Sequence, residues 1–119
     1  MGIKFSNNFV TTISGAINNS VTTIPIASAT GFPALGASDF AFCTLQKESP
    51  FALEIVKVTA RSGTNLTVVR AQDGTSASAF NSGDAFELRI TAGGINQVVA
   101  TAASAASVDD ATALAIALG

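Results

Sequence analysis

The middle of the chain alternates apolar and polar residues with the period of two that is typical of half-buried β-strands. In residues 85–91, for example, Phe86, Leu88 and Ile90 fall on one face, and Glu87 and Arg89 fall on the other. The same pattern, enriched in β-branched residues, predicts strands over residues 21–26, 40–47, 52–61, 66–70 and 85–91.

Short turn signals separate these strands. They lie at residues 48–50, 62–65, 73–74 and 82–84 and consist mainly of Gly, Pro, Asn, Asp and Ser. Pro25 has no backbone donor, so the first strand is expected at an edge of the sheet or ends there. Strands this short with close turns predict a mainly β fold, a small antiparallel β-sandwich or barrel over residues 21–92.

The first 20 residues have a different pattern. They carry no charge after Lys4, and asparagine pairs at 7–8 and 18–19 flank one short apolar stretch, residues 9–13. We expect either an extended N-terminal arm that adds a strand to a neighbouring molecule or an edge strand of the chain's own domain. In the first case Phe9, Val10 and Ile13 are candidate contacts between subunits.

Residues 93–119 form an alanine-rich tail. Alanine favours helix and disfavours strand, so the tail is predicted to be helical, with a new helix start at Ser107 followed by Asp109 and Asp110. An alanine-rich helix buries too little surface to be stable alone. We therefore expect the helix to pack against copies from other subunits or to dock on its own β-domain, and disorder of the tail is the remaining alternative. Its candidate contacts with other subunits are Val98, Val99, Leu114 and Leu118.

Composition favours assembly. Hydrophobic residues make up 48% of the chain, charged residues only 12%, and the mean hydropathy is +0.47. A surface so poor in charge is typical of an obligate oligomer before assembly, and we expect a homo-oligomer, with a trimer favoured. The six basic residues are scattered, which argues against nucleic-acid binding.

No apolar run approaches the roughly 20 residues of a membrane span, and the first residues do not resemble a signal peptide. We therefore expect no membrane partner and synthesis in a cytoplasm without export by the usual route.

Candidate catalytic chemistry is sparse. The chain has no histidine, which removes the Ser-His-Asp and Cys-His arrangements and the usual zinc sites. Cys43 lies in an apolar run and is expected to be a buried small side chain. Glu54 and Glu87 lie near basic residues in the sequence and are expected to form ion pairs or solvated faces. We predict no catalytic, cofactor-binding or metal-binding residues, and we do not expect an enzyme.

The most distinctive stretch is residues 70–75, which read RAQDGT. Arg70 ends a predicted strand and a loop containing Asp73 and Gly74 follows. We predict that the Arg70 guanidinium pins this loop, by binding loop carbonyl groups or by pairing with Asp73 or Asp84. A ligand-binding arginine is the alternative.

The same stretch carries a family resemblance. Residues 54–59 (EIVKVT), 66–75 (LTVVRAQDGT) and 83–91 (GDAFELRIT), with 31–34 (GFPA) upstream, resemble a module of tailed-bacteriophage virion proteins. The resemblance spans roughly residues 20–97 and implies a β-fold, a virion location and no catalytic residues.

The resemblance leaves the place in the virion open. Fibre-type members continue after this module into long shafts, whereas here only a short alanine-rich tail follows it. We therefore expect a capsid decoration (cement) protein that bridges subunits of the major capsid protein. The alternatives are a tail-fibre docking or head–tail adaptor module that contacts other virion proteins, and a carbohydrate-binding module on the virion surface. The absence of Trp and Tyr argues against the carbohydrate-binding module.

Overall fold

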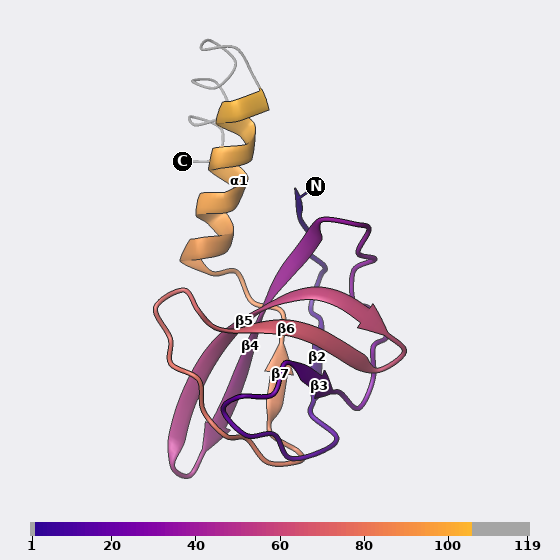
Figure 1. The fold of residues 1–119 in the computed structure, drawn as a ribbon, viewed down its shortest axis with the longest axis vertical. Coiled ribbons are helices and arrows are strands. Elements are labelled where there is room, and N and C mark those ends of the chain that lie inside the picture. The colour runs from indigo at the N-terminus through magenta and orange to yellow at the C-terminus, as the bar shows by residue number, and fades with distance from the viewer. Residues whose placement is uncertain (1, 106–119) are drawn as a thin grey trace.

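A computed structural model of the chain describes residues 2–105. Seven strands and one helix follow one another along the chain (Figure 1). They are β1 (Gly2–Ile3), β2 (Val10–Thr12), β3 (Thr23–Pro25), β4 (Asp39–Glu48), β5 (Phe51–Ser62), β6 (Asn65–Gln72), β7 (Ala85–Glu87) and α1 (Ala92–Ala105). The mainly β prediction is confirmed.

The strands form one curled, antiparallel sheet in the order β2-β7-β4-β5-β6-β3, with β1 added to β4 in parallel. Its centre is the long β4–β5 hairpin, paired from Ala41↔Val58 to Glu48↔Phe51. A two-residue turn joins β5 to β6, and Gly63 adopts a φ of +62° there. The turn predicted at residues 62–65 is therefore confirmed.

The two ends of the sheet meet. Ile13, just after β2, forms a bridge with Ile26, just after β3. Ser14 donates to the Pro25 carbonyl at 3.0 Å, and Ala27 donates to the Thr12 carbonyl at 2.8 Å. Pro25 acts only as an acceptor at this junction, so its missing N–H costs nothing. The sheet is thus a half-barrel with its edges drawn together, and β3 lies at the end of the strand order as Pro25 predicted.

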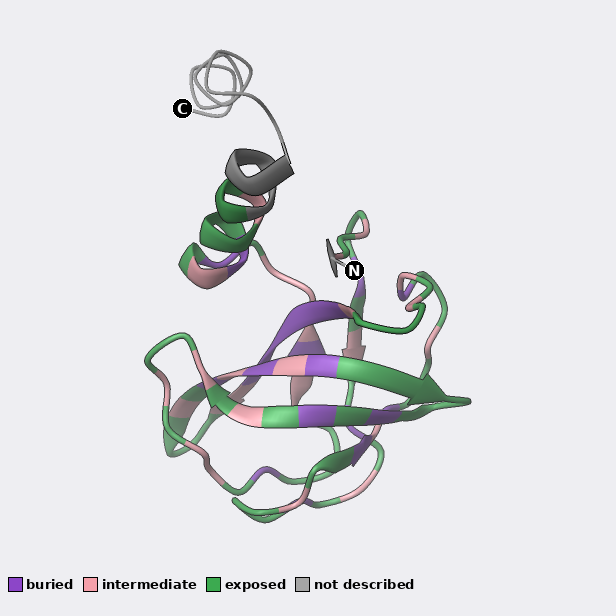
Figure 2. Cartoon of the chain, turned by 45° about the horizontal axis from the view of Figure 1, so that its top comes forward, coloured by how far each residue is buried: buried purple, intermediate pink, exposed green. Residues whose placement is uncertain are grey.

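The core fills the concave side. Buried residues recur at every second position in the middle of β5, at Glu54, Val56 and Val58, and in the first half of β6, at Leu66 and Val68 (Figure 2). Fully or nearly fully buried side chains from every part of the β-domain meet here, including Leu45, Val56, Val58, Leu66, Phe80 and Phe86. Cys43 is also fully buried, as expected, and burial raises the pKa of its thiol.

The predicted N-terminal arm is instead part of the domain. β2 pairs with β7, and Ile17 exchanges two hydrogen bonds with Phe80. Phe9, Ile13 and Ile17 are buried in the common core. Burial of each such side chain stabilises the folded chain by about 1.5–3 kcal/mol. An extended arm would lose this stabilisation unless a partner covered it. The alternative prediction, an edge strand of the same domain, describes this segment.

The last strand is shorter than predicted. β7 ends at Glu87, and the chain leaves the sheet after Leu88 donates to the Phe9 carbonyl. Ile90 was predicted to share a strand face with Phe86, which is fully buried, but Ile90 is 75% exposed, because residues 88–91 turn toward the start of α1. This segment joins the sheet to the helix.

Helix α1 follows where the sequence changes to alanine, and it projects away from the sheet (Figure 1). It contacts β1 near its first turn. Within residues 2–105, no helix has the length and apolar character needed to cross a membrane. The second helix start at Ser107 and the candidate contacts Leu114 and Leu118 lie outside the described residues.

Candidate functional site: the buried ion pair and the base of helix α1

A buried ion pair lies where β5 and β6 meet the loops. Arg70 donates to both carboxylate oxygens of Glu54, with Nε–Oε2 and Nη2–Oε1 distances of 2.8 Å. The Glu54 side chain is fully buried and that of Arg70 is 8% exposed. A charge removed from water is tolerated only when paired and fully hydrogen-bonded, so the remaining polar atoms of the pair decide its stability.

Every polar position of the pair is satisfied. The three remaining Arg70 N–H groups bind the carbonyls of Asn18, Val21 and Ser78 at 2.6–2.9 Å. Glu54 also accepts the backbone N–H groups of Ala71 and Ser78, both at 2.9 Å. Burial alone would raise the pKa of Glu54, but the bonds from Arg70, Ser78 and Ala71 and the charge of Arg70 together lower it.

Of the two alternative contacts predicted for Arg70, the structure shows the first. Arg70 does bind loop carbonyls, but its acidic partner is Glu54, and neither Asp73 nor Asp84 pairs with it. Asp84 closes its own turn by accepting the Asn81 N–H at 2.7 Å. Gly74 occupies a turn position with a φ of +77°. The difference arises where β5 and β6 shift register between Ile55 and Lys57, because Glu54 and Arg70 lie at this irregularity, one on each strand, and reach each other by their side chains.

Asp73 instead reaches helix α1. Its Oδ2 accepts the Gly93 N–H at 3.0 Å, in the first turn of the helix. Thr91 is the N-cap, with its Oγ1 accepting the Gly94 N–H at 3.0 Å. A side chain at Gly94 would meet Ile3 and Phe42 at 3.3 and 3.6 Å, so the absence of a Cβ lets the helix seat closely on the sheet. We call the contacts of Asp73, Thr91 and Gly94 the helix socket.

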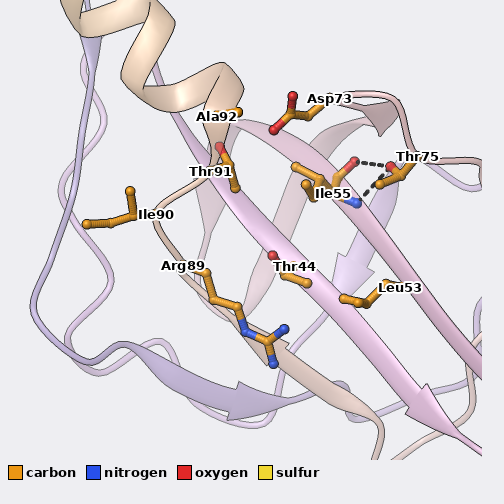
Figure 3. Close-up of a pocket in the computed structure, with 9 residues that line it drawn as sticks. All are labelled: Thr44, Leu53, Ile55, Asp73, Thr75, Arg89, Ile90, Thr91 and Ala92. Atoms are coloured by element: carbon orange, nitrogen blue, oxygen red, sulfur yellow. Dashed lines mark hydrogen bonds between the residues drawn. The ribbon is translucent and has the colours of Figure 1, made fainter.

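An apolar groove of about 260 Å³ opens beside the helix socket (Figure 3). Thr44, Leu53 and Ile55 from the outer face of β4 and β5 line it on one side, and Ile90 and Ala92 on the other. A second hollow of about 430 Å³ lies beyond Ile90 and is lined partly by Phe5 and Val10. Arg89 and Ile90 border both.

The candidate subunit contacts from the sequence separate into two groups. Phe9 and Ile13 are 2% and 1% exposed, so the prediction that they touch another subunit is wrong. Val10 is 64% exposed, Val99 is 41% exposed and Val98 is half-buried, so these three remain available.

Sequence reasoning missed Ile90, Leu53 and Phe5 as surface residues and did not foresee the burial of Glu54. A signal for Glu54 was present. It shares the alternation of Val56 and Val58, and Arg70 shares that of Leu66 and Val68, so opposite charges occupy core-face positions on paired strands.

No group of three His, Cys, Asp or Glu residues within the described part of the chain could hold a metal ion. Glu54, whose pKa is lowered by its hydrogen bonds and by the charge of Arg70, is enclosed by the protein's own donors. Comparisons with known protein families and with curated proteins found no match to the chain.

Replacing Asp73 with alanine is expected to loosen helix α1, because Gly93 loses its acceptor. Loss of one such cap costs about 1 kcal/mol. Amide hydrogen exchange at Gly93 and Gly94 should quicken about fivefold, corresponding to that cost, while exchange at Val56 in the core stays unchanged. Asp73→Asn keeps an acceptor and tolerates the positive φ of this position, so it is the matched control. Equal exchange in both variants would contradict the role of Asp73.

Proposed function

We propose that this chain is a structural subunit of a tailed-bacteriophage particle that assembles as a homotrimer through α1 and acts as a docking or adaptor module. The observation that carries the proposal is helix α1 itself. Its 14 residues contain no charged side chain, and it projects from the β-domain with Ile95 and Val99 both more than 40% exposed.

An isolated helix of this length is marginal in water, and most helical stability in proteins comes from packing of an apolar face. Ile95, Val98 and Val99 stand at the i, i+3, i+4 spacing of such a face. The helix socket holds only the first turn. A parallel bundle with α1 from two other copies gives the rest of the helix a packing partner.

The phage setting is supported by the resemblance of residues 54–59, 66–75 and 83–91 to virion proteins. In this chain the charged residues Glu54 and Arg70 of those segments hold strands and loops together. That role suits a scaffold whose activity is to present a surface.

Between the two virion roles, the geometry favours docking over capsid decoration. The decoration mechanism relied on an N-terminal arm that reaches a neighbour, and this segment is built into the domain's own sheet. The projecting helix instead suits a module that joins one component to another along an axis.

The test is the mass of the assembly. Native mass spectrometry of the full chain should give a trimer, and Val99→Asp should weaken it by about a hundredfold or more, because the bundle would bury an unpaired charge. Val69→Asp is the matched control, since Val69 is 47% exposed on β6 and should leave the trimer intact. A wild-type monomer at micromolar concentration would overturn the proposal.

Imaging of labelled virions tests the location. Label confined to one vertex or to the tail supports docking, whereas label over the whole head would replace docking with decoration.

A further inference from the structure

The apolar face of α1 runs without a break into the groove on the sheet. Ala92, Ile95 and Val99 occupy positions i, i+3 and i+7, which lie on one side of a helix. Ala92 also lines the groove, together with Leu53 and Ile90 (Figure 3). The helix face and the groove are therefore two parts of one continuous apolar surface, joined at Ala92.

A partner can cover the groove without burying an unpaired charge. Its two charged residues already have partners within the chain. Asp73 accepts the Gly93 N–H, and Arg89 donates to Gln46 at 2.8 Å and to Glu87 at 3.1 Å. The rest of the lining is apolar or threonine. Its volume of about 260 Å³ is several times the roughly 30 Å³ of one water molecule, which leaves room for a branched aliphatic side chain.

The helix face is too small to hold an assembly by itself. Among the described side chains it offers Ile95, Val98 and Val99 as the only residues larger than alanine on that face. Stable interfaces bury about 800 Å² on each partner. A stable trimer needs further area next to the helix, and the groove that Ala92 helps to line offers the exposed side chains of Leu53 and Ile90.

Ile90 is the most exposed large hydrophobic residue of the described chain, at 75%. It stands on the rim of the groove, in the segment that leads into α1. In a trimer with threefold symmetry, each subunit contacts the next one head to tail. Each subunit therefore needs two different patches that are complementary to each other. The chain presents one protruding residue and one hollow, both at the base of the same helix.

We propose that a second copy of the chain occupies the groove: Ile90 of one subunit inserts between Leu53 and Ile90 of the next, and this contact closes the trimer below the α1 bundle. The inference rests on the proposed homotrimer and adds the β-domain contact to it.

Cross-linking between two single-cysteine variants tests this contact. Ile90→Cys chains are mixed with tagged Leu53→Cys chains, and the mixture is dissociated, reassembled and then oxidised. Because each chain carries only one introduced cysteine, a disulfide between positions 90 and 53 can form only between two chains. A disulfide-linked heterodimer is expected at a yield at least about tenfold above that of the matched mixture of Ile90→Cys with Val69→Cys. The native Cys43 does not interfere, because its thiol is buried.

The outcomes separate this inference from the proposed function. If native mass spectrometry shows trimers but the disulfide-linked heterodimer does not exceed the control, the Ile90 contact is overturned and the proposed trimer is not. A monomeric wild-type chain would overturn both. As a second measurement, Ile90→Asp should weaken the trimer at least about tenfold relative to Val69→Asp. Equal trimer stability in the two variants would also contradict insertion of Ile90.

Discussion

Replacing Arg70 with methionine is expected to lower the free energy of unfolding by about 3–5 kcal/mol. The substitution leaves the Glu54 carboxylate buried without its counter-charge and leaves the carbonyls of Asn18, Val21 and Ser78 without a donor. The loss is large because Glu54 is fully buried, so water cannot replace the guanidinium. Chemical denaturation monitored by circular dichroism at pH 7 measures it.

Two further variants make this result interpretable. Arg61→Met removes an exposed arginine whose recorded contact is the Gly63 carbonyl, and it should change stability by no more than about 0.5 kcal/mol. The double variant Arg70→Met, Glu54→Leu should recover part of the loss, because no unpaired charge is left inside. An Arg70→Met loss no greater than that of Arg61→Met would contradict the role of the ion pair.

The ion pair also has a defined pH dependence. Because the pKa of Glu54 is lowered in the folded chain, its contribution is complete above the unfolded value of about 4.3 and is lost as the pH falls through the lower folded pKa. As the pH falls through this range, the free energy of unfolding of the wild type should therefore decrease more than that of the double variant, which has no carboxylate at position 54.

Replacing Phe86 with alanine is expected to cost about 3–5 kcal/mol. Phe86 is fully buried at the centre of β7, opposite Leu45 of β4 and Thr11 of β2. This strand has only three residues, so the buried ring contributes much of what holds β2 to the rest of the sheet. Denaturant titration gives the loss of stability.

Val69→Ala serves as the control for Phe86→Ala. Val69 is 47% exposed, and truncating it should change stability by about 0.5 kcal/mol or less. Hydrogen exchange should also quicken at Leu88, whose amide binds the Phe9 carbonyl beside β2. A loss below about 1 kcal/mol for Phe86→Ala would show that the cavity collapses and that β7 is held by other contacts.

The sequence by itself determined the elements that depend on neighbouring residues. Strand periodicity and turn residues predicted the β4–β5–β6 meander, and the lack of a donor at Pro25 predicted the place of β3 at the end of the sheet. The change to alanine predicted that a helix follows the last strand. These features are local, because side-chain direction and backbone donors repeat with the period of the element.

Only the tertiary structure decided which distant segments meet. It placed Phe9 and Ile13 in the core, gave Arg70 the partner Glu54, and turned Ile90 outward at the base of α1. Each of these depends on pairing between strands far apart in the sequence, or on where a strand stops. Neither is encoded in local periodicity, because a strand can continue its alternation in sequence after its last backbone hydrogen bond has been made.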